Sequence, residues 1–226
     1  MLELLRVLQL GDSMLPVGSF SFSNGLESAI QSGLVHNLTT LESFVRTALA
    51  SAATSDGVGL LHAHRAALAG EWQRILEIDR SIFNRKLNEE MRVMTIRMGL
   101  KLAELAEHLE KDSQVSNWRA AIKRGETPGT YPVAQALVFA AHHLSEQQAF
   151  AVQQYGLTTM MLGAALRLMK LHHLEAQDLL FRFNQTAESA YQEIVGTALE
   201  DMAAFAPQWD ILASVHVKSH VRMFMN

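Results

Sequence analysis

The fold class is decided by one stretch, Ser145-Glu-Gln-Gln-Ala-Phe-Ala-Val-Gln-Gln-Tyr-Gly-Leu-Thr-Thr-Met-Met-Leu-Gly-Ala-Ala-Leu-Arg-Leu168, which is rich in helix-forming residues and contains no proline. Ser145 is followed three residues later by Gln148, a capping box that predicts the start of a helix. The most apolar window of the chain, Tyr155 to Leu171, is near the lower length limit for a membrane span and contains an Arg and a Lys. We therefore expect a buried core helix. Gly156 and Gly163 predict close backbone packing along it.

Other segments carry similar helix signals. Thr39 and Glu42 predict a capping box for a helix over 38–49, and Asn24 and Glu27 offer a third such pairing. The stretch 88–110 predicts a long amphipathic helix, because five apolar residues form one stripe: Met91, Met94, Met98, Leu102 and Leu105.

The whole chain reads as helices separated by short breaks. No alternating run of β-branched and aromatic residues of strand length is present. Glycine and proline predict breaks at 11–18, 33–38, 56–59, 70, 125–131 and 207. We see no repeat, low-complexity run or long linker. The sequence therefore predicts an all-α protein, a single compact domain over residues 1–226 with about nine or ten helices.

Composition narrows the classes of function. The chain has 226 residues, 49% of them hydrophobic and 19% charged, which argues for a globular protein. Its net charge of −4, with no long basic run, argues against nucleic acid as a partner. The absence of cysteine excludes disulfides, thiolate metal sites and a Cys nucleophile and suits a cytoplasmic protein. Glu3 and Arg6 interrupt the apolar N-terminus, so neither a targeting segment nor a membrane association is expected.

The ten histidines do not predict a metal site. His62 and His64 point in different directions on a helix, and the adjacent pairs at 142–143 and 172–173 diverge as well. His216 and His220 share one helical face at i, i+4 spacing, but two ligands are half a site and no acid follows Asp210. We expect surface histidines, no bound metal and no cofactor.

Signatures of catalysis are missing from the sequence. It contains no Gly-x-Ser-x-Gly elbow, phosphate-binding loop or dinucleotide fingerprint. The acids Glu89, Glu90, Glu104 and Glu107 alternate with Arg and Lys, which is typical of a solvated helix face. The residues alone therefore predict an interaction protein and not an enzyme.

One loop stands out, Gly11-Asp-Ser-Met-Leu-Pro-Val-Gly-Ser-Phe-Ser-Phe-Ser-Asn-Gly-Leu-Glu27. Pro16 fixes its own φ and keeps Leu15 extended, and Gly18 permits a positive φ. Phe20 and Phe22, among small polar residues, predict a contact surface, because aromatic side chains bury a large area with few rotors. An ordinary interhelical turn is the alternative.

The part of this loop from Leu15 to Glu27 resembles the N-terminal signature of the UreF family of urease accessory proteins, Leu-Pro-(Ile/Val)-Gly, an aromatic residue and Ser-x-Gly-Leu-Glu. Further similarities follow in the family's order: Glu90-Met-Arg92, Arg97-Met-Gly99, Tyr131-Pro-Val133, Ala164-Ala-Leu-Arg-Leu168, then His216 and Arg222-Met-Phe224. The chain departs from the family at Ala134-Gln135, where Phe-Gly is usual, at Leu168 to His173, where the family usually has Val-Pro-Leu-Gly-Gln, and at Val217, where Glu is usual.

This resemblance implies a non-catalytic, dimeric, all-α scaffold. Members of the family bind the accessory protein UreD (or UreH) and with it recruit the GTPase UreG to apo-urease for nickel insertion beside a carbamylated lysine. The positions implied to bind partners are Pro16, Gly18, Ser19, Phe20, Ser23, Gly25, Glu27, His216, Val217, Val221, Arg222 and Phe224. Two alternatives remain open, a His-dependent nickel-binding enzyme or storage protein, and a GTPase-regulating adaptor of another metallocentre assembly system.

The segment 210–226 is expected to be a docking element for these partners. Ala213, Val217, Val221 and Phe224 form one stripe beside the basic residues Lys218 and Arg222. An isolated helix this short is marginal, so we expect it to become helical when bound. The alternative is that the stripe packs on its own domain.

Overall fold

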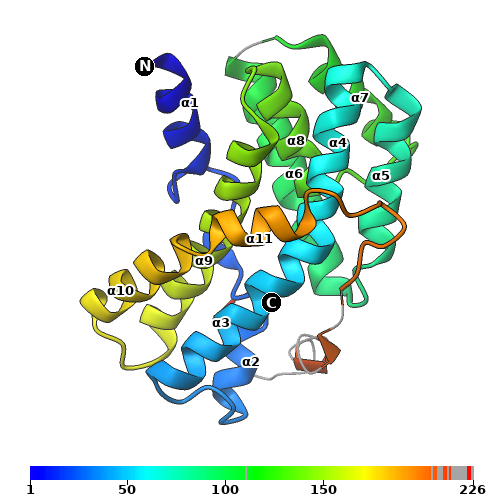
Figure 1. Cartoon of the computed structure of the whole chain (residues 1–226). Helices are drawn as coiled ribbons and strands as arrows, with labels where there is room; N and C mark the ends of the chain where they lie inside the picture. The colour runs from blue at the N-terminus through cyan, green and yellow to red at the C-terminus, as the bar shows by residue number, and fades with distance from the viewer. Residues whose placement is uncertain (110, 205, 208–210, 213, 215–222, 225–226) are drawn as a thin grey trace.

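The computed structural model describes residues 1–109, 111–204, 206–207, 211–212, 214 and 223–224 (Figure 1). Within these residues the chain is helical and contains no strand, which confirms the all-α prediction. A 3-10 turn, η1 (Ser19–Ser21), and a π-helical segment, η2 (Ala53–Gly57), accompany the α-helices. The α-helices are α1 (Leu2–Gly11), α2 (Leu26–Gln31), α3 (Leu38–Ala52), α4 (Val58–Ala69), α5 (Trp72–Asn84), α6 (Glu89–Leu109), α7 (Ser113–Lys123), α8 (Tyr131–Ala141), α9 (Glu146–Leu168), α10 (His173–Asn184) and α11 (Ala187–Ile194).

The long helix α9 joins two clusters of buried side chains. The larger core lies among α4 to α8 and the first half of α9, and includes Trp118, Phe139 and Phe150. The smaller core lies among α2, α3, α10 and the second half of α9, with Leu41 and Met161 at its centre. Figure 1 shows the two groups of helices on opposite sides of the molecule, with α9 passing through both. Because one rigid helix serves both cores, they form a single compact domain.

Helix α8 is the centre of the larger core. Every residue from 132 to 140 is buried, as expected for a helix that is apolar on all sides. Its neighbours α4 and α6 pack along it. The start of α8 is held by Asp79 of α5, a side chain with no exposed surface. Its carboxylate accepts four hydrogen bonds from the loop before α8, donated by the hydroxyls of Thr127 and Thr130 and the amides of Gly129 and Thr130.

The capping predictions have mixed outcomes. The box at Ser145 and Gln148 is confirmed, since the Ser145 hydroxyl accepts from the Gln148 amide at 3.1 Å. The box predicted at Thr39 and Glu42 is wrong, because Asn37 caps α3 with Thr40 at the third position. Glu42 instead contacts Arg46 and Arg182, at 2.7 and 2.8 Å.

The pairing of Asn24 with Glu27 is also wrong. Asn24 has a φ of 57°, and α2 begins after Gly25 with no side-chain cap. The long helix predicted over 88–110 is confirmed as α6, with Met98 and Leu102 buried.

Three predictions about glycine are wrong for the same reason. Whether a glycine ends a helix or permits close packing depends on contacts with residues that are distant in the sequence. The break predicted at 56–59 is absent, since α3 continues through η2 into α4. There a side chain on Gly57 or Gly59 would lie 2.8 Å from Phe150 or 2.6 Å from Ile82, so these glycines permit close packing. At Gly156 and Gly163, where close packing was predicted, no described residue outside the adjacent turns of α9 has an atom within 4 Å of an added Cβ.

Among the described residues, no helix combines the length and apolar character that a membrane crossing requires. Helix α9 is buried along its core face at Met161, Leu162, Ala164 and Ala165, while Leu166 and Arg167 are exposed.

Candidate protein-binding surface

The loop between α1 and α2, which we call the signature loop (12–25), has a backbone organised from its first residue. The Asp12 carboxylate accepts from the Met14 amide at 2.8 Å, and its carbonyl accepts from the Leu15 amide at 3.0 Å. Gly18 has a φ of +83° and leads into η1, and Gly25 has a φ of +80° before α2. Both angles lie in the left-handed region that favours glycine, so these two positions set the path of the loop.

Side chains of the signature loop divide between surface and core. Phe20 is 69% exposed, whereas Phe22 is 3% exposed and packs in the larger core together with Val17. The prediction that both phenylalanines form a contact surface is therefore wrong for Phe22. Phe20 lies within the 3-10 turn η1 and Phe22 follows it in extended backbone, so the change of backbone conformation separates the two rings.

The predicted partner-binding residues of the signature loop and α2 divide in the same way. Pro16 and Phe20 are exposed, and Gly18 and Ser19 are half-buried. Ser23, Gly25 and Glu27 are buried. The Ser23 hydroxyl accepts from the Glu27 amide at 3.3 Å, at the beginning of α2. Of the predicted partner-binding residues in this part of the chain, Pro16 and Phe20 are therefore the most accessible.

Glu27 contacts residues 223 and 224 of the C-terminal segment 210–226, which we call the tail. Its carboxylate accepts hydrogen bonds from the amides of Met223 at 2.8 Å and Phe224 at 3.0 Å. The Phe224 side chain is 5% exposed and belongs to the smaller core, together with Leu212. At Phe224, then, the expected docking stripe packs on its own domain, which is the alternative considered above. Met223 is 62% exposed, and Ile211 is 61% exposed.

Four of the predicted tail residues, His216, Val217, Val221 and Arg222, lie outside the described residues, as do Ala213, Lys218 and His220. Nothing in the structure tests the prediction of a docking helix over them.

Arg167, at the end of α9, lies between the signature loop and the tail. Its guanidinium group donates to the Phe20 carbonyl at 3.0 Å and to the Gly163 carbonyl at 3.2 Å. The same group stacks over the ring of Phe224, 4.2 Å from the ring centre. The two segments predicted to bind partners, far apart in sequence, therefore meet at Arg167.

A cavity of about 160 Å³ lies beside the signature loop and was not predicted from the sequence. Val17 and Ser19 line it with four methionines: Met91, Met94, Met98 and Met160. Its polar lining includes the ion pair between Lys86 and Asp56, at 2.6 Å. The side-chain amides of Asn88 and Gln153 also line it, and each has one buried atom with no hydrogen-bond partner among the residues that the structure describes. Such atoms favour polar molecules or water in the cavity.

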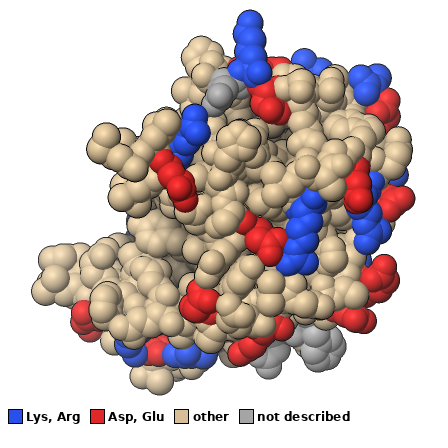
Figure 2. Space-filling view, turned by 45° about the horizontal axis from the view of Figure 1, so that its top comes forward, with Lys and Arg blue, Asp and Glu red and all other residues tan. Residues whose placement is uncertain are grey.

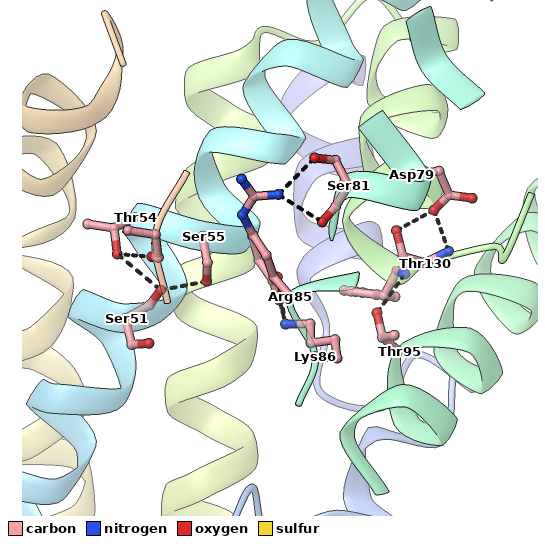
Figure 3. A network of polar contacts seen from close by, with 12 residues as sticks. Ser51, Thr54, Ser55, Asp79, Ser81, Arg85, Lys86, Thr95 and Thr130 are labelled. Carbon is pink, nitrogen blue, oxygen red and sulfur yellow. Dashed lines mark hydrogen bonds and ion pairs between the residues drawn. The ribbon is translucent and has the colours of Figure 1, made fainter. Parts of the chain in front are cut away.

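Figure 3 shows a network of polar side chains near this cavity. Two of its members, Thr54 and Arg85, bind the backbone at residues 202–203. The Arg85 guanidinium donates to the Met202 carbonyl at 2.8 Å and to the Ser81 hydroxyl at 2.8 Å. Thr54, in the π-helical segment, donates to the Ala203 carbonyl at 2.8 Å. The chain up to residue 203 is thereby attached to α5 and η2.

No group of three or more metal-ligating side chains occurs among the described residues. His62 and His64 do not point at a common site, because the first contacts the Thr197 carbonyl at 2.9 Å and the second the Leu144 carbonyl at 2.8 Å. Burial lowers the pKa of His64. Of the predicted helix-face acids, Glu104 is bound to Lys101 at 2.8 Å, and Glu107 contacts Arg119.

Helix α1 presents a group of four exposed leucines, Leu2, Leu4, Leu5 and Leu8, each more than half exposed. Among the described elements α1 packs mainly on α9 and stands at the margin of the molecule (Figure 1). On the face shown in Figure 2, acidic and basic side chains are interspersed and leave wide uncharged areas between them. Exposed apolar groups of this kind are typical of surfaces that bind other proteins.

The fold and this surface define a class, an all-helical protein that exposes apolar side chains on its first helix and signature loop. Comparison with known proteins identifies the family. The UreF family model matches residues 35–184. The chain is 55% identical over 223 residues to "Urease accessory protein UreF 2" of Brucella canis, covering 99% of this chain and 92% of that protein. It is 46% identical over 224 residues to the Yersinia pseudotuberculosis "Urease accessory protein UreF", covering 99% and 98%. The chain therefore belongs to the UreF family of urease accessory proteins.

Proposed function

We propose that this protein is a non-catalytic scaffold of urease maturation in the cytoplasm. With a UreD/UreH-type accessory protein it recruits a UreG-type GTPase to apo-urease, where nickel is inserted. The proposal is supported above all by the identity to urease accessory proteins over nearly the whole chain. A scaffold acts through contacts that differ between the states of its partners, so it requires no catalytic group of its own.

We assign these contacts to exposed apolar residues. Phe20 offers an aromatic anchor on a loop whose backbone is held by hydrogen bonds and two left-handed glycines. Aromatic residues, Phe among them, are enriched in the buried centres of protein–protein interfaces, because they bury a large area with few rotatable bonds. The leucines of α1 offer a second apolar surface, which we assign to self-association as a homodimer.

Removal of Phe20 tests the proposal. Phe20→Ala should weaken the complex with the UreD/UreH-type protein, or self-association, by about 1 to 4 kcal/mol. Helical content and thermal stability should be unchanged, because the side chain is exposed. Phe181→Ala on α10 is the matched control, since Phe181 is 67% exposed. An equal loss of thermal stability would make Phe20 a structural residue and contradict its role as an anchor.

Activity in a reconstituted system tests the scaffold role as a whole. Urease subunits expressed with the other accessory proteins should gain nickel-dependent activity only when this chain is present. The purified chain should hydrolyse neither GTP nor urea. Turnover that persists through purification, or stoichiometric sub-micromolar binding of nickel by the isolated chain, would favour the alternative of a nickel-binding enzyme or store.

A further inference from the structure

Glu27 is a buried carboxylate whose two oxygens receive two different amides. Oε1 accepts from Met223 and Oε2 accepts from Phe224, and only 2% of the residue is exposed. A carboxylate is an acceptor at both oxygens, whereas the amide of Gln accepts at one and donates at the other. The two consecutive amides of the tail therefore require an acid at this position.

Arg167 completes the contact from the other side. Its guanidinium carbon lies over the Phe224 ring, and one of its N–H groups donates to the Phe20 carbonyl. The Arg167 side chain is exposed, and so are the neighbouring side chains Phe20 and Met223. A guanidinium can stack on a ring and donate in its own plane at the same time, which an ammonium cannot do.

We propose that Glu27 and Arg167 form a tail clamp, a pair of positioning residues that holds the chain at 223–224 against the signature loop. The clamp joins the signature loop and residues 223–224 into one composite surface, in which the exposed side chains of Phe20 and Met223 are presented together. This inference rests on the proposed function, because the composite surface is the one offered to the accessory partner. Glu27, which the resemblance implied to be a partner-binding residue, thus has an intramolecular role in this proposal.

The test measures the tail and the partner separately. In the full-length protein, hydrogen exchange at the Met223 and Phe224 amides should be slow, and Glu27→Gln should accelerate it by about tenfold or more. Glu71→Gln, the same chemical change at an exposed carboxylate, is the matched control and should leave both rates unchanged. Affinity for the UreD/UreH-type partner should fall in Glu27→Gln and stay unchanged in Glu71→Gln.

Arg167→Lys provides a second variant that does not alter the buried site. It keeps the charge but loses the stacking, so exchange at Phe224 should accelerate while the helical spectrum is retained. Unchanged exchange at both amides in Glu27→Gln and Arg167→Lys would overturn the clamp. So would rapid exchange in these variants with undiminished partner affinity. If the wild-type chain does not bind the partner at all, the proposed function fails, and the exchange rates alone decide whether the clamp exists.

Discussion

Asp79 offers the sharpest test of how this fold is held together. Its Oδ1 accepts from the Thr130 amide at 2.8 Å and the Thr130 hydroxyl at 2.5 Å. Its Oδ2 accepts from the Gly129 amide at 2.8 Å and the Thr127 hydroxyl at 2.6 Å. Burial raises the pKa of the Asp79 carboxyl, and the four hydrogen bonds oppose that rise. Removing the Asp79 carboxylate from water is costly, but both of its oxygens accept two hydrogen bonds each inside the protein.

The substitution Asp79→Asn keeps the shape and breaks this pattern. The amide oxygen can replace one carboxylate oxygen, but the NH₂ group must face the donors at the other. A hydroxyl can rotate to accept, whereas the backbone amide of Gly129 cannot, and it would lose its partner. One hydrogen bond is lost and one buried backbone amide is left unsatisfied, which amounts to about 1 to 3 kcal/mol of unfolding free energy. For a chain of this length the melting temperature should fall by roughly 2 to 4 °C per kcal/mol.

The assay is urea unfolding followed by circular dichroism at 222 nm. Asp178→Asn, the same change at an exposed acid on α10, should shift the unfolding free energy by no more than about 0.5 kcal/mol. Thr127→Val removes one donor and should cost about 1 to 2 kcal/mol. If Asp79→Asn costs less than about 1 kcal/mol, the four contacts do not stabilise the start of α8, and the reasoning is refuted.

Three further predictions concern packing, acid stability and the tail. Gly99→Ala should destabilise the protein by about 1 to 3 kcal/mol, because the new methyl group would meet the Gly129 carbonyl oxygen and lie 2.9 Å from the Thr130 carbonyl carbon; thermal melts should show this loss, and an unchanged melting temperature would contradict it. The pKa of His64 is lower in the folded protein than the value of about 6.5 in the unfolded chain, so His64 takes up its proton in the unfolded chain first as the pH falls. The stability that depends on a neutral His64 is therefore fully present above about pH 6.5 and is lost below it. His64→Gln should therefore lose less stability than wild type between pH 7.5 and 5, as measured by unfolding in urea, and parallel pH profiles would refute the prediction. Deletion of 215–226 should leave a folded protein that no longer co-purifies with the UreD/UreH-type partner, and an unchanged affinity would show that the tail is not required.

Local signals carried the fold class, because helix periodicity and capping depend on residues a few positions apart. The box at Ser145 and Gln148 is confirmed for that reason. The failure at Thr39 has the same origin, since Asn37 lies two residues earlier and is at least as good a cap. Element type is thus readable from periodicity, while the exact cap is a competition among nearby polar residues.

Non-local contacts explain what could not be predicted. Asp79 lies in a polar stretch of an amphipathic helix, and its partners are 48 to 51 residues away. The cavity beside the signature loop is likewise assembled from separate elements. Of the candidate site, the sequence indicated the exposed Phe20, but it could not show that Glu27 faces the tail 196 residues later.

The range matched by the family model separates the helical core from the two segments predicted to bind partners. The UreF model covers residues 35–184, a range that holds most of both cores but leaves out the signature loop and the tail. Arg167 lies within the matched range and contacts both outer segments, through the Phe20 carbonyl and the Phe224 ring. Arg167 can therefore hold the signature loop and Phe224 together from a position within the helical core. For this reason we expect the effects of Glu27→Gln and Arg167→Lys on tail exchange to be coupled. In the double variant the acceleration should fall short of the product of the two single effects, because once either residue has released Phe224 the other has little left to hold.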